Sequence, residues 1–142
     1  MAYMSQETKS KIVGAVKPIL KKFGLKGTFA VRNHSTIVLN IKSGKIDFIE
    51  NFIETDIQKP YAKYMTEDQV AYIRKNKTLD VNPYWFQEHF SGNAKKALTE
   101  IFTAMKRAGN WYDNSDAQID YFDTAYYVDV NIGKWNKPYT VE

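Results

Sequence analysis

An alternating stretch at residues 27–45, GTFAVRNHSTIVLNIKSGK, constrains the fold of this chain more than any other feature of the sequence. Its apolar residues recur at every second position in two runs, a spacing typical of strands with one buried face. The apolar members are Phe29, Val31, Ile37, Leu39 and Ile41. Directly opposed residues of paired strands share a face, so both runs reach one core only across a turn with an odd number of residues. The stretch therefore predicts a β-hairpin whose turn is residues 33–35.

The hairpin turn, Asn33-His34-Ser35, is polar throughout. Asn33 or His34 can adopt the left-handed conformation that such a loop often needs. The same register places three further side chains on the outward, polar surface beside the turn: Arg32, Thr36 and Lys42.

The tip of the hairpin contains more hydrogen-bonding side chains than a turn requires. Residues 32–35 supply four in succession, whereas Asn-Gly would make a tight turn at a lower conformational cost. We therefore expect the tip to be exposed and to take part in recognition. Two alternatives remain open: the tip folds back to cap a neighbouring helix, or it packs beneath the aromatic residues 84–90.

Helical spacing of apolar residues predicts a first helix at about 6–23 and another at about 92–108. Pro18 lies inside the first and predicts a kink near 13–17 or a division into two helices. Shorter helices are expected at about 46–54, at 67–75 behind a Thr66–Gln69 capping box, and after Asn82-Pro83. Alternation predicts a strand at 127–132, with 118–122 as an optional further strand.

These elements indicate one α+β domain covering residues 1–142. We expect a small, mainly antiparallel sheet, made of the N-terminal hairpin and the C-terminal strand, with helices on one face. The helix at 6–23 and the helix at 92–108 would form this cover. The strand residues predicted to share the resulting core are Phe29, Ile37, Leu39, Val128 and Val130.

Charge is distributed unevenly along the chain. Residues 1–45 contain nine basic residues and one acidic residue, while the remainder of the chain has a net negative charge. A basic helix and hairpin can attract phosphates, so direct DNA or RNA binding is one hypothesis; the other is that the two ends of the chain fold together and neutralise each other. The residues proposed for nucleic-acid or partner binding are Lys9, Lys17, Lys21, Lys22, Arg32, Asn33, His34, Ser35 and Lys42.

Aromatic residues are concentrated in the last third of the chain, beside carboxylates that would repel phosphate. Tyrosine and tryptophan are typical anchors of protein interfaces. The possible protein-interface residues are Trp111, Tyr112, Tyr126, Tyr127 and Trp135.

Catalytic patterns are weak. The chain has no cysteine, its two histidines His34 and His89 have no zinc-ligand spacing, and no Gly-rich phosphate loop is present. His34-Ser35 suggests a base and a nucleophile, but adjacent side chains in a turn usually point apart. We therefore predict no catalytic residue, no metal site and no cofactor.

Carboxylates in the stretch 113–129 leave a metal-dependent hydrolase as a further alternative. A solvated acidic loop is the competing interpretation, because DNSD lacks the glycine and the terminal glutamate of a calcium loop. The aspartates concerned are Asp113, Asp116, Asp120, Asp123 and Asp129.

Parts of the sequence resemble known proteins. The segments LKKFGLKGTFAVRNHSTIVLNIKSGK and YYVDVNIGKWNKPY look like small accessory proteins of bacteriophages and other mobile elements. Residues 14–55 also resemble the large polyvalent protein-associated domains, whose pattern LKK, FxVR and an apolar strand ending near a glycine is matched by Leu20-Lys21-Lys22, Phe29-Ala30-Val31-Arg32 and Ser43-Gly44. This chain has a shorter hairpin loop and a different continuation, so no functional residue is carried over. The resemblance implies a phage or plasmid protein that acts in a bacterial cytoplasm against host defences.

The leading functional hypothesis is a non-enzymatic binding protein of a phage or mobile element. It would interfere with host nucleic-acid-handling or defence machinery, in the anti-CRISPR or a similar anti-defence manner, by occupying a surface of a host protein or ribonucleoprotein complex. The N-terminus has no apolar run of signal-peptide length and no stretch is long enough to span a membrane, so we expect the cytoplasm of the bacterial host. The oligomeric state stays open.

Overall fold

The computed structural model describes residues 2–58, 65–114, 124–134 and 136–142. In chain order the helices and strands are α1 (Gln6–Lys22), β1 (Leu25–Arg32), β2 (Thr36–Gly44), α2 (Phe48–Ile57), α3 (Glu67–Asn76), β3 (Leu79–Val81), α4 (Phe86–His89), α5 (Gly92–Ala108), β4 (Tyr127–Ile132) and β5 (Thr140–Val141). The fold is α+β, as predicted.

The strands form one mixed, mainly antiparallel sheet in the order β1-β2-β4-β3, with β5 beside the end of β2. The β1–β2 and β3–β4 pairs are antiparallel. The β2–β4 pair is parallel, with Leu39 opposite Val130 and Asn40 opposite Asn131. Neither this parallel pairing nor the short strands β3 and β5 were predicted from the sequence, and the optional strand at 118–122 lies outside the described residues.

The predicted hairpin is confirmed. Arg32 lies opposite Thr36, so the turn consists of the three residues between them, and Phe29 lies opposite Leu39. A β-bulge between Lys26 and Gly27 shifts the register near the open end of the hairpin.

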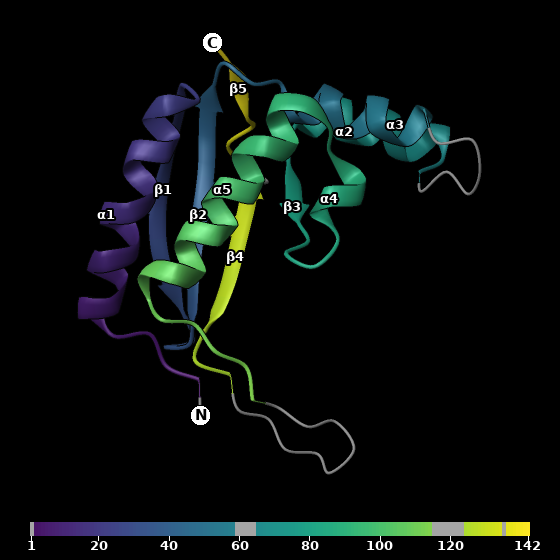
Figure 1. Ribbon diagram of the computed structural model, residues 1–142. Coiled ribbons are helices and arrows are strands. Elements are labelled where there is room, and N and C mark those ends of the chain that lie inside the picture. The colour runs from purple at the N-terminus through teal and green to yellow at the C-terminus, as the bar shows by residue number, and fades with distance from the viewer. Residues whose placement is uncertain (1, 59–64, 115–123, 135) are drawn as a thin grey trace.

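Helices α1 and α5 lie side by side on one face of the sheet, while α2 and α3 extend beyond its upper corner (Figure 1). Within the described ranges no helix covers the opposite face (Figure 1). We call this opposite side the uncovered face.

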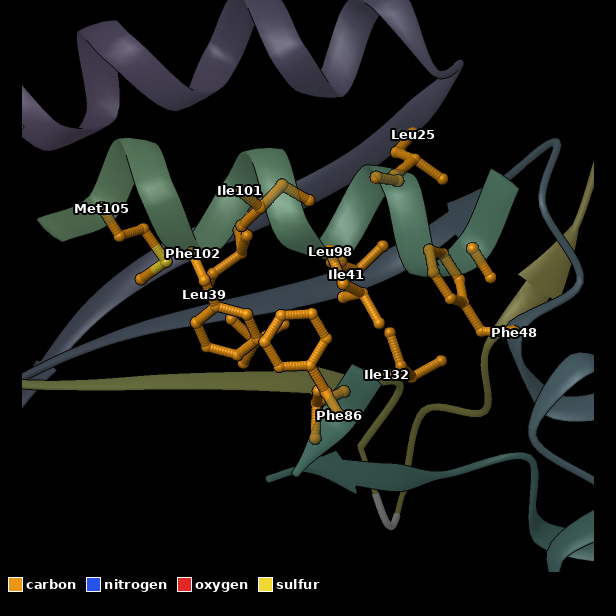
Figure 2. Close-up of a cluster of buried hydrophobic side chains, with 14 of the residues drawn as sticks. Leu25, Leu39, Ile41, Phe48, Phe86, Leu98, Ile101, Phe102, Met105 and Ile132 are labelled. Carbon is orange, nitrogen blue, oxygen red and sulfur yellow. The ribbon is translucent and has the colours of Figure 1, made fainter. Parts of the chain in front are cut away.

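The core lies between the sheet and the two covering helices. Leu98, Ile101 and Met105 of α5 are fully buried, and Figure 2 shows them above strand residues such as Leu39 and Ile41. The predicted common core is confirmed. Its strand members are Ile37, Leu39 and Val130, which are buried, with Phe29 and Val128 partly buried against them.

Helix α1 runs uninterrupted through Pro18, so of the two predicted outcomes, a kink near residues 13–17 or a division into two helices, the division is wrong. A proline at position 18 leaves the carbonyl of Gly14 without its helical hydrogen-bond donor. Both residues are exposed, so water can satisfy that carbonyl, and the helix tolerates the proline.

The local signals of the middle segment are largely confirmed. Thr66 and Gln69 form the predicted capping box at the start of α3. The Asn82 side chain accepts hydrogen bonds from the backbone N–H groups of Tyr84 and Trp85, at 2.8 and 3.2 Å, but α4 itself begins at Phe86. Among the helices described, none has the length and the apolar composition that a membrane span requires.

Candidate functional site

Four segments far apart in the sequence meet where the hairpin turns. The backbone N–H of Met4 donates to the carbonyl of His34 at 2.7 Å, and the N–H of Tyr3 donates to the carbonyl of Ala125 at 3.0 Å. The N–H of Tyr127 donates to the carbonyl of Ser35 at 2.9 Å. These main-chain bonds join the N-terminal segment, the hairpin turn and the start of β4 into one surface, and a bond from the N–H of Ala125 to the carbonyl of residue 112 adds the segment after α5.

We call this region the hairpin-end surface. Its exposed side chains are Tyr3, Arg32, Asn33, His34, Tyr112 and Tyr127.

Three tyrosines are the largest apolar groups on the hairpin-end surface. Tyr3 is 64% exposed, Tyr112 46% and Tyr127 47%. The backbone of each takes part in the hydrogen bonds described above, so the main chain that positions each ring is tied to a neighbouring segment. Tyr112 and Tyr127 were predicted as interface residues, whereas Tyr3 was missed because nothing in the sequence indicates that the N-terminal segment pairs with residue 125.

The hairpin turn is held in a strained but ordered conformation. Asn33 has a φ of 53° and His34 a φ of 60°, and the N–H of Ser35 donates to the carbonyl of Arg32 at 3.2 Å. Positive φ at two successive residues is the geometry of a type I′ turn, where the second position is normally glycine. The His34 carbonyl binds the N-terminal segment while the His34 side chain is exposed, so the tip is docked through its backbone and free to make contacts through its side chains.

Replacing His34 with glycine is expected to raise the free energy of unfolding by about 0.5–1 kcal/mol. Glycine removes the left-handed strain of about 1–2 kcal/mol, and its greater freedom in the unfolded chain offsets about 0.4–1 kcal/mol of that gain. Chemical denaturation of the two proteins provides the measurement. A loss of stability would instead mean that the imidazole makes a contact that supports the fold.

Arg32 extends from the hairpin end onto the uncovered face, where its guanidinium lies 3.0 Å from the carboxylate of Asp129. Thr36 was predicted to be exposed beside it, but it is buried. The prediction was wrong because β2 is a central strand, and Thr36 is flanked by Arg32 on β1 and Tyr127 on β4.

Two of the predicted interface aromatics make contacts within the fold. Tyr126 is only 2% exposed, and its hydroxyl donates to the carbonyls of Met105 and Lys106 at the end of α5. The indole N–H of Trp111 donates to the Tyr126 carbonyl at 2.7 Å, and the Lys106 ammonium lies 4.3 Å from the centre of the Trp111 ring. Tyr126 is therefore not available to a partner, and Trp135 lies outside the described residues.

The predicted basic residues do not form one footprint. Lys9 is partly buried near the start of α1, about 18 Å along the helix from Lys21 at its end. Lys22 is paired with Glu100 of α5 at 2.9 Å, and Lys42 is exposed at the far end of β2 from the hairpin turn. The tip and the C-terminal end of α1 thus lie at opposite ends of the sheet (Figure 1).

Four lysines nevertheless gather at the C-terminal end of α1, around an open depression of about 530 Å³ that Glu142 also lines. They are Lys17, Lys21, Lys26 and Lys45. Lys26 is paired with Glu142 at 3.3 Å. Hydrogen bonds from Ser43 and Lys26 lower the pKa of the Glu142 carboxyl, so the acid stays ionised beside the lysines.

The residues considered for catalysis are not assembled into a reactive group in the described part of the chain. His34 and Ser35 share no side-chain hydrogen bond there, and the His89 ring packs 5.7 Å from the Phe52 ring. Among the residues that the structure describes, no cluster of three His, Asp or Glu is placed to hold a metal ion. Asp113 accepts a hydrogen bond from the Thr124 hydroxyl at 3.2 Å, whereas the aspartates at 116, 120 and 123 lie outside the described residues.

Comparisons with family models, with curated proteins and with solved structures give no match to this chain.

Proposed function

We propose that this chain is a non-enzymatic binding protein that recognises a protein partner through the hairpin-end surface. The observation that carries the proposal is the group of three exposed tyrosines, Tyr3, Tyr112 and Tyr127, held together by main-chain hydrogen bonds from distant segments. Tyrosine offers a large amphipathic contact area and loses little conformational entropy on binding.

The polar residues of the same surface suit a protein partner better than a phosphate backbone. Asn33 and His34 offer adaptable hydrogen bonds around the tyrosines, a combination found in protein-binding loops. Arg32 is already paired with Asp129, which reduces its attraction for phosphate. A docked main chain also lowers the entropy cost of binding, because the contact residues are ordered beforehand.

The proposed biological context follows from the sequence resemblance to accessory proteins of phages and mobile elements. In that context the partner is a bacterial host protein or ribonucleoprotein complex of the nucleic-acid-handling or defence machinery. The chain would act in the host cytoplasm by covering a surface that the machinery needs.

Direct binding of DNA or RNA is the second candidate function. The four lysines around the depression at the end of α1 favour it, since lysines that converge from a helix, a strand and a loop can neutralise several phosphates. Glu142 in the same depression and the Lys22–Glu100 pair reduce the local positive charge, so we rank this candidate second.

A capture experiment with matched variants tests the proposal. Bacterial lysate is passed over the wild-type protein, over a Tyr112→Ala/Tyr127→Ala double variant and over Tyr72→Ala, which removes an exposed tyrosine from α3 instead. We expect one saturable partner whose recovery falls at least tenfold with the double variant and is unchanged with Tyr72→Ala, at equal melting temperatures.

Two results would contradict the proposal. Equal recovery by the double variant would place the interface elsewhere. Direct nucleic-acid binding would be favoured if recovery of the partner is lost after nuclease treatment and is reduced by Lys17→Glu/Lys21→Glu but not by the tyrosine substitutions.

A further inference from the structure

The uncovered face of the sheet contains a row of polar residues that crosses all four main strands. Thr28 of β1 lies opposite Asn40 of β2, Asn40 lies opposite Asn131 of β4, and Asn131 lies opposite Asp80 of β3. Side chains in register on neighbouring strands point to the same face. Leu39 and Ile41 point into the core, so this row faces the other way.

The centre of this row is the Asn40–Asn131 pair. The Asn131 amide N–H donates to the Asn40 side-chain oxygen at 3.1 Å, although Asn40 is only 8% exposed. Asparagine is disfavoured in strands, and central positions usually hold β-branched or aromatic residues. Two asparagines opposite each other on the two central strands therefore reduce strand stability, which is unusual unless their amides have a further role.

The hydrogen bond between the two amides leaves other donors and acceptors of both side chains unpaired in the described part of the chain. One shared bond uses one donor and one acceptor, whereas each carboxamide has two N–H donors and an oxygen with two lone pairs. Within the described residues no other hydrogen bond reaches the Asn40 amide nitrogen or the Asn131 amide oxygen. A nearly buried amide normally has its polar atoms paired, so the remaining donor and acceptor are available to a ligand.

These free groups open into a depression of about 590 Å³ on the uncovered face. Ala30 and Val38 line it beside the asparagines and provide an apolar surface. Asp80 and Lys134 also line it and carry opposite charges, while Arg32, at its edge, is neutralised by Asp129. The volume falls within the range of small-molecule sites, and the balanced charge favours a ligand without net charge.

We propose that the Asn40–Asn131 pair binds the hydrogen-bonding edge of a nucleobase, as the free base or within an uncharged nucleoside. A nucleobase presents a donor and an acceptor side by side in one plane, and an asparagine amide matches that edge with two hydrogen bonds. The apolar surface of Ala30 and Val38 suits the flat ring. Asp80 is placed in the same row to accept hydrogen bonds from ribose hydroxyls. This site shares only Arg32 with the hairpin-end surface, and the binding proposed here does not involve the three tyrosines.

The amide signals of the asparagines give a direct test. ¹⁵N-labelled protein is titrated with adenosine, guanosine, cytidine and uridine while the side-chain NH₂ resonances of Asn40 and Asn131 are followed by NMR. We expect saturable shifts of both resonances with at least one nucleoside. Asn131→Ala should lower the affinity for that nucleoside at least tenfold. Asn93→Ala, which removes an exposed asparagine of α5, should leave the affinity unchanged.

Two further measurements decide the class of ligand. Asp80→Asn should lower the affinity for the nucleoside and leave the affinity for the corresponding free base unchanged, because only the nucleoside has the ribose hydroxyls. Acetamide serves as a simple amide probe that lacks a ring. Equal binding of acetamide and of the free base would overturn the nucleobase assignment, and so would the absence of saturable shifts with all four nucleosides.

Discussion

Gly133→Ala is expected to lower the free energy of unfolding by about 3 kcal/mol, combining left-handed strain with overpacking. Gly133 has a φ of 71° directly after β4, and a Cβ atom there would lie 2.7 Å from the carbonyl oxygen of Lys77 and 2.8 Å from the backbone nitrogen of Tyr139. Those two atoms are themselves joined by a 2.9 Å hydrogen bond that ties the C-terminal segment to the residue after α3. Backbone atoms in a hydrogen bond cannot move aside cheaply, so the substitution separates them.

Gly92→Ala is the matched control. Gly92 also has a positive φ, 57°, but a Cβ atom there would meet no other atom within 4 Å. The Gly92→Ala substitution should therefore lower the free energy of unfolding only by the left-handed strain, about 1–2 kcal/mol. Urea denaturation of both variants measures the difference, and equal losses would show that crowding at position 133 is relieved by a small shift.

Tyr126→Ala is expected to lower the free energy of unfolding by about 3–5 kcal/mol, the range for removing a buried aromatic side chain. The ring is almost wholly buried, and its hydroxyl binds the last carbonyls of α5, so the side chain fixes the end of this helix to the start of β4. Tyr126→Phe should lose only the hydroxyl contacts, about 1–2 kcal/mol. Tyr112→Ala, at an exposed tyrosine nearby in the fold, should change stability by less than about 0.5 kcal/mol.

The same tyrosine predicts how stability depends on alkaline pH. Burial raises the pKa of Tyr126 to about 12, and a backbone hydrogen bond from Gly109 opposes the shift. An unfolded tyrosine ionises near pH 10, so the stabilisation is complete below pH 10 and is lost as the pH rises towards 12, by about 2–3 kcal/mol. Tyr126→Phe should show a smaller loss over this interval. Parallel pH profiles of the two proteins would contradict the assignment.

Local signals in the sequence were sufficient for most of the elements. The hairpin register follows from the alternation of Phe29, Val31 and the apolar residues of β2, and the three-residue turn follows from that register. The α3 capping box and the apolar stripe of α5 depend on neighbours within a few residues. Such features do not require knowledge of the rest of the fold.

Pairings between distant segments could not be predicted in this way. The parallel contact between β2 and β4 depends on how the intervening helices return the chain to the sheet. Tyr126 looked like a surface aromatic because its run is rich in tyrosine, and only the position of the α5 carbonyls explains its burial. Alternation was also misleading at Thr36, since both neighbours of a central strand cover its outward positions.

The candidate sites were predicted in part. Tyr112, Tyr127, Asn33 and His34, all chosen from the sequence, are exposed, but their union with Tyr3 depends on main-chain bonds that no sequence pattern encodes. Asn40 and Asn131 each resembled an ordinary polar position of an alternating strand. Only the parallel register brings them together.

The parallel register also has a consequence for how the protein is made on the ribosome. Asn40 and Asn131 are 91 residues apart, so β2 leaves the ribosome long before the strand that completes its second edge. At about 5–20 residues per second, this interval lasts roughly 5–20 s, while the β1–β2 hairpin can form within microseconds. The nascent chain therefore presents a hairpin with an open, apolar edge for several seconds, and chaperone binding or aggregation during synthesis would act on β2 before α5 and β4 can cover it.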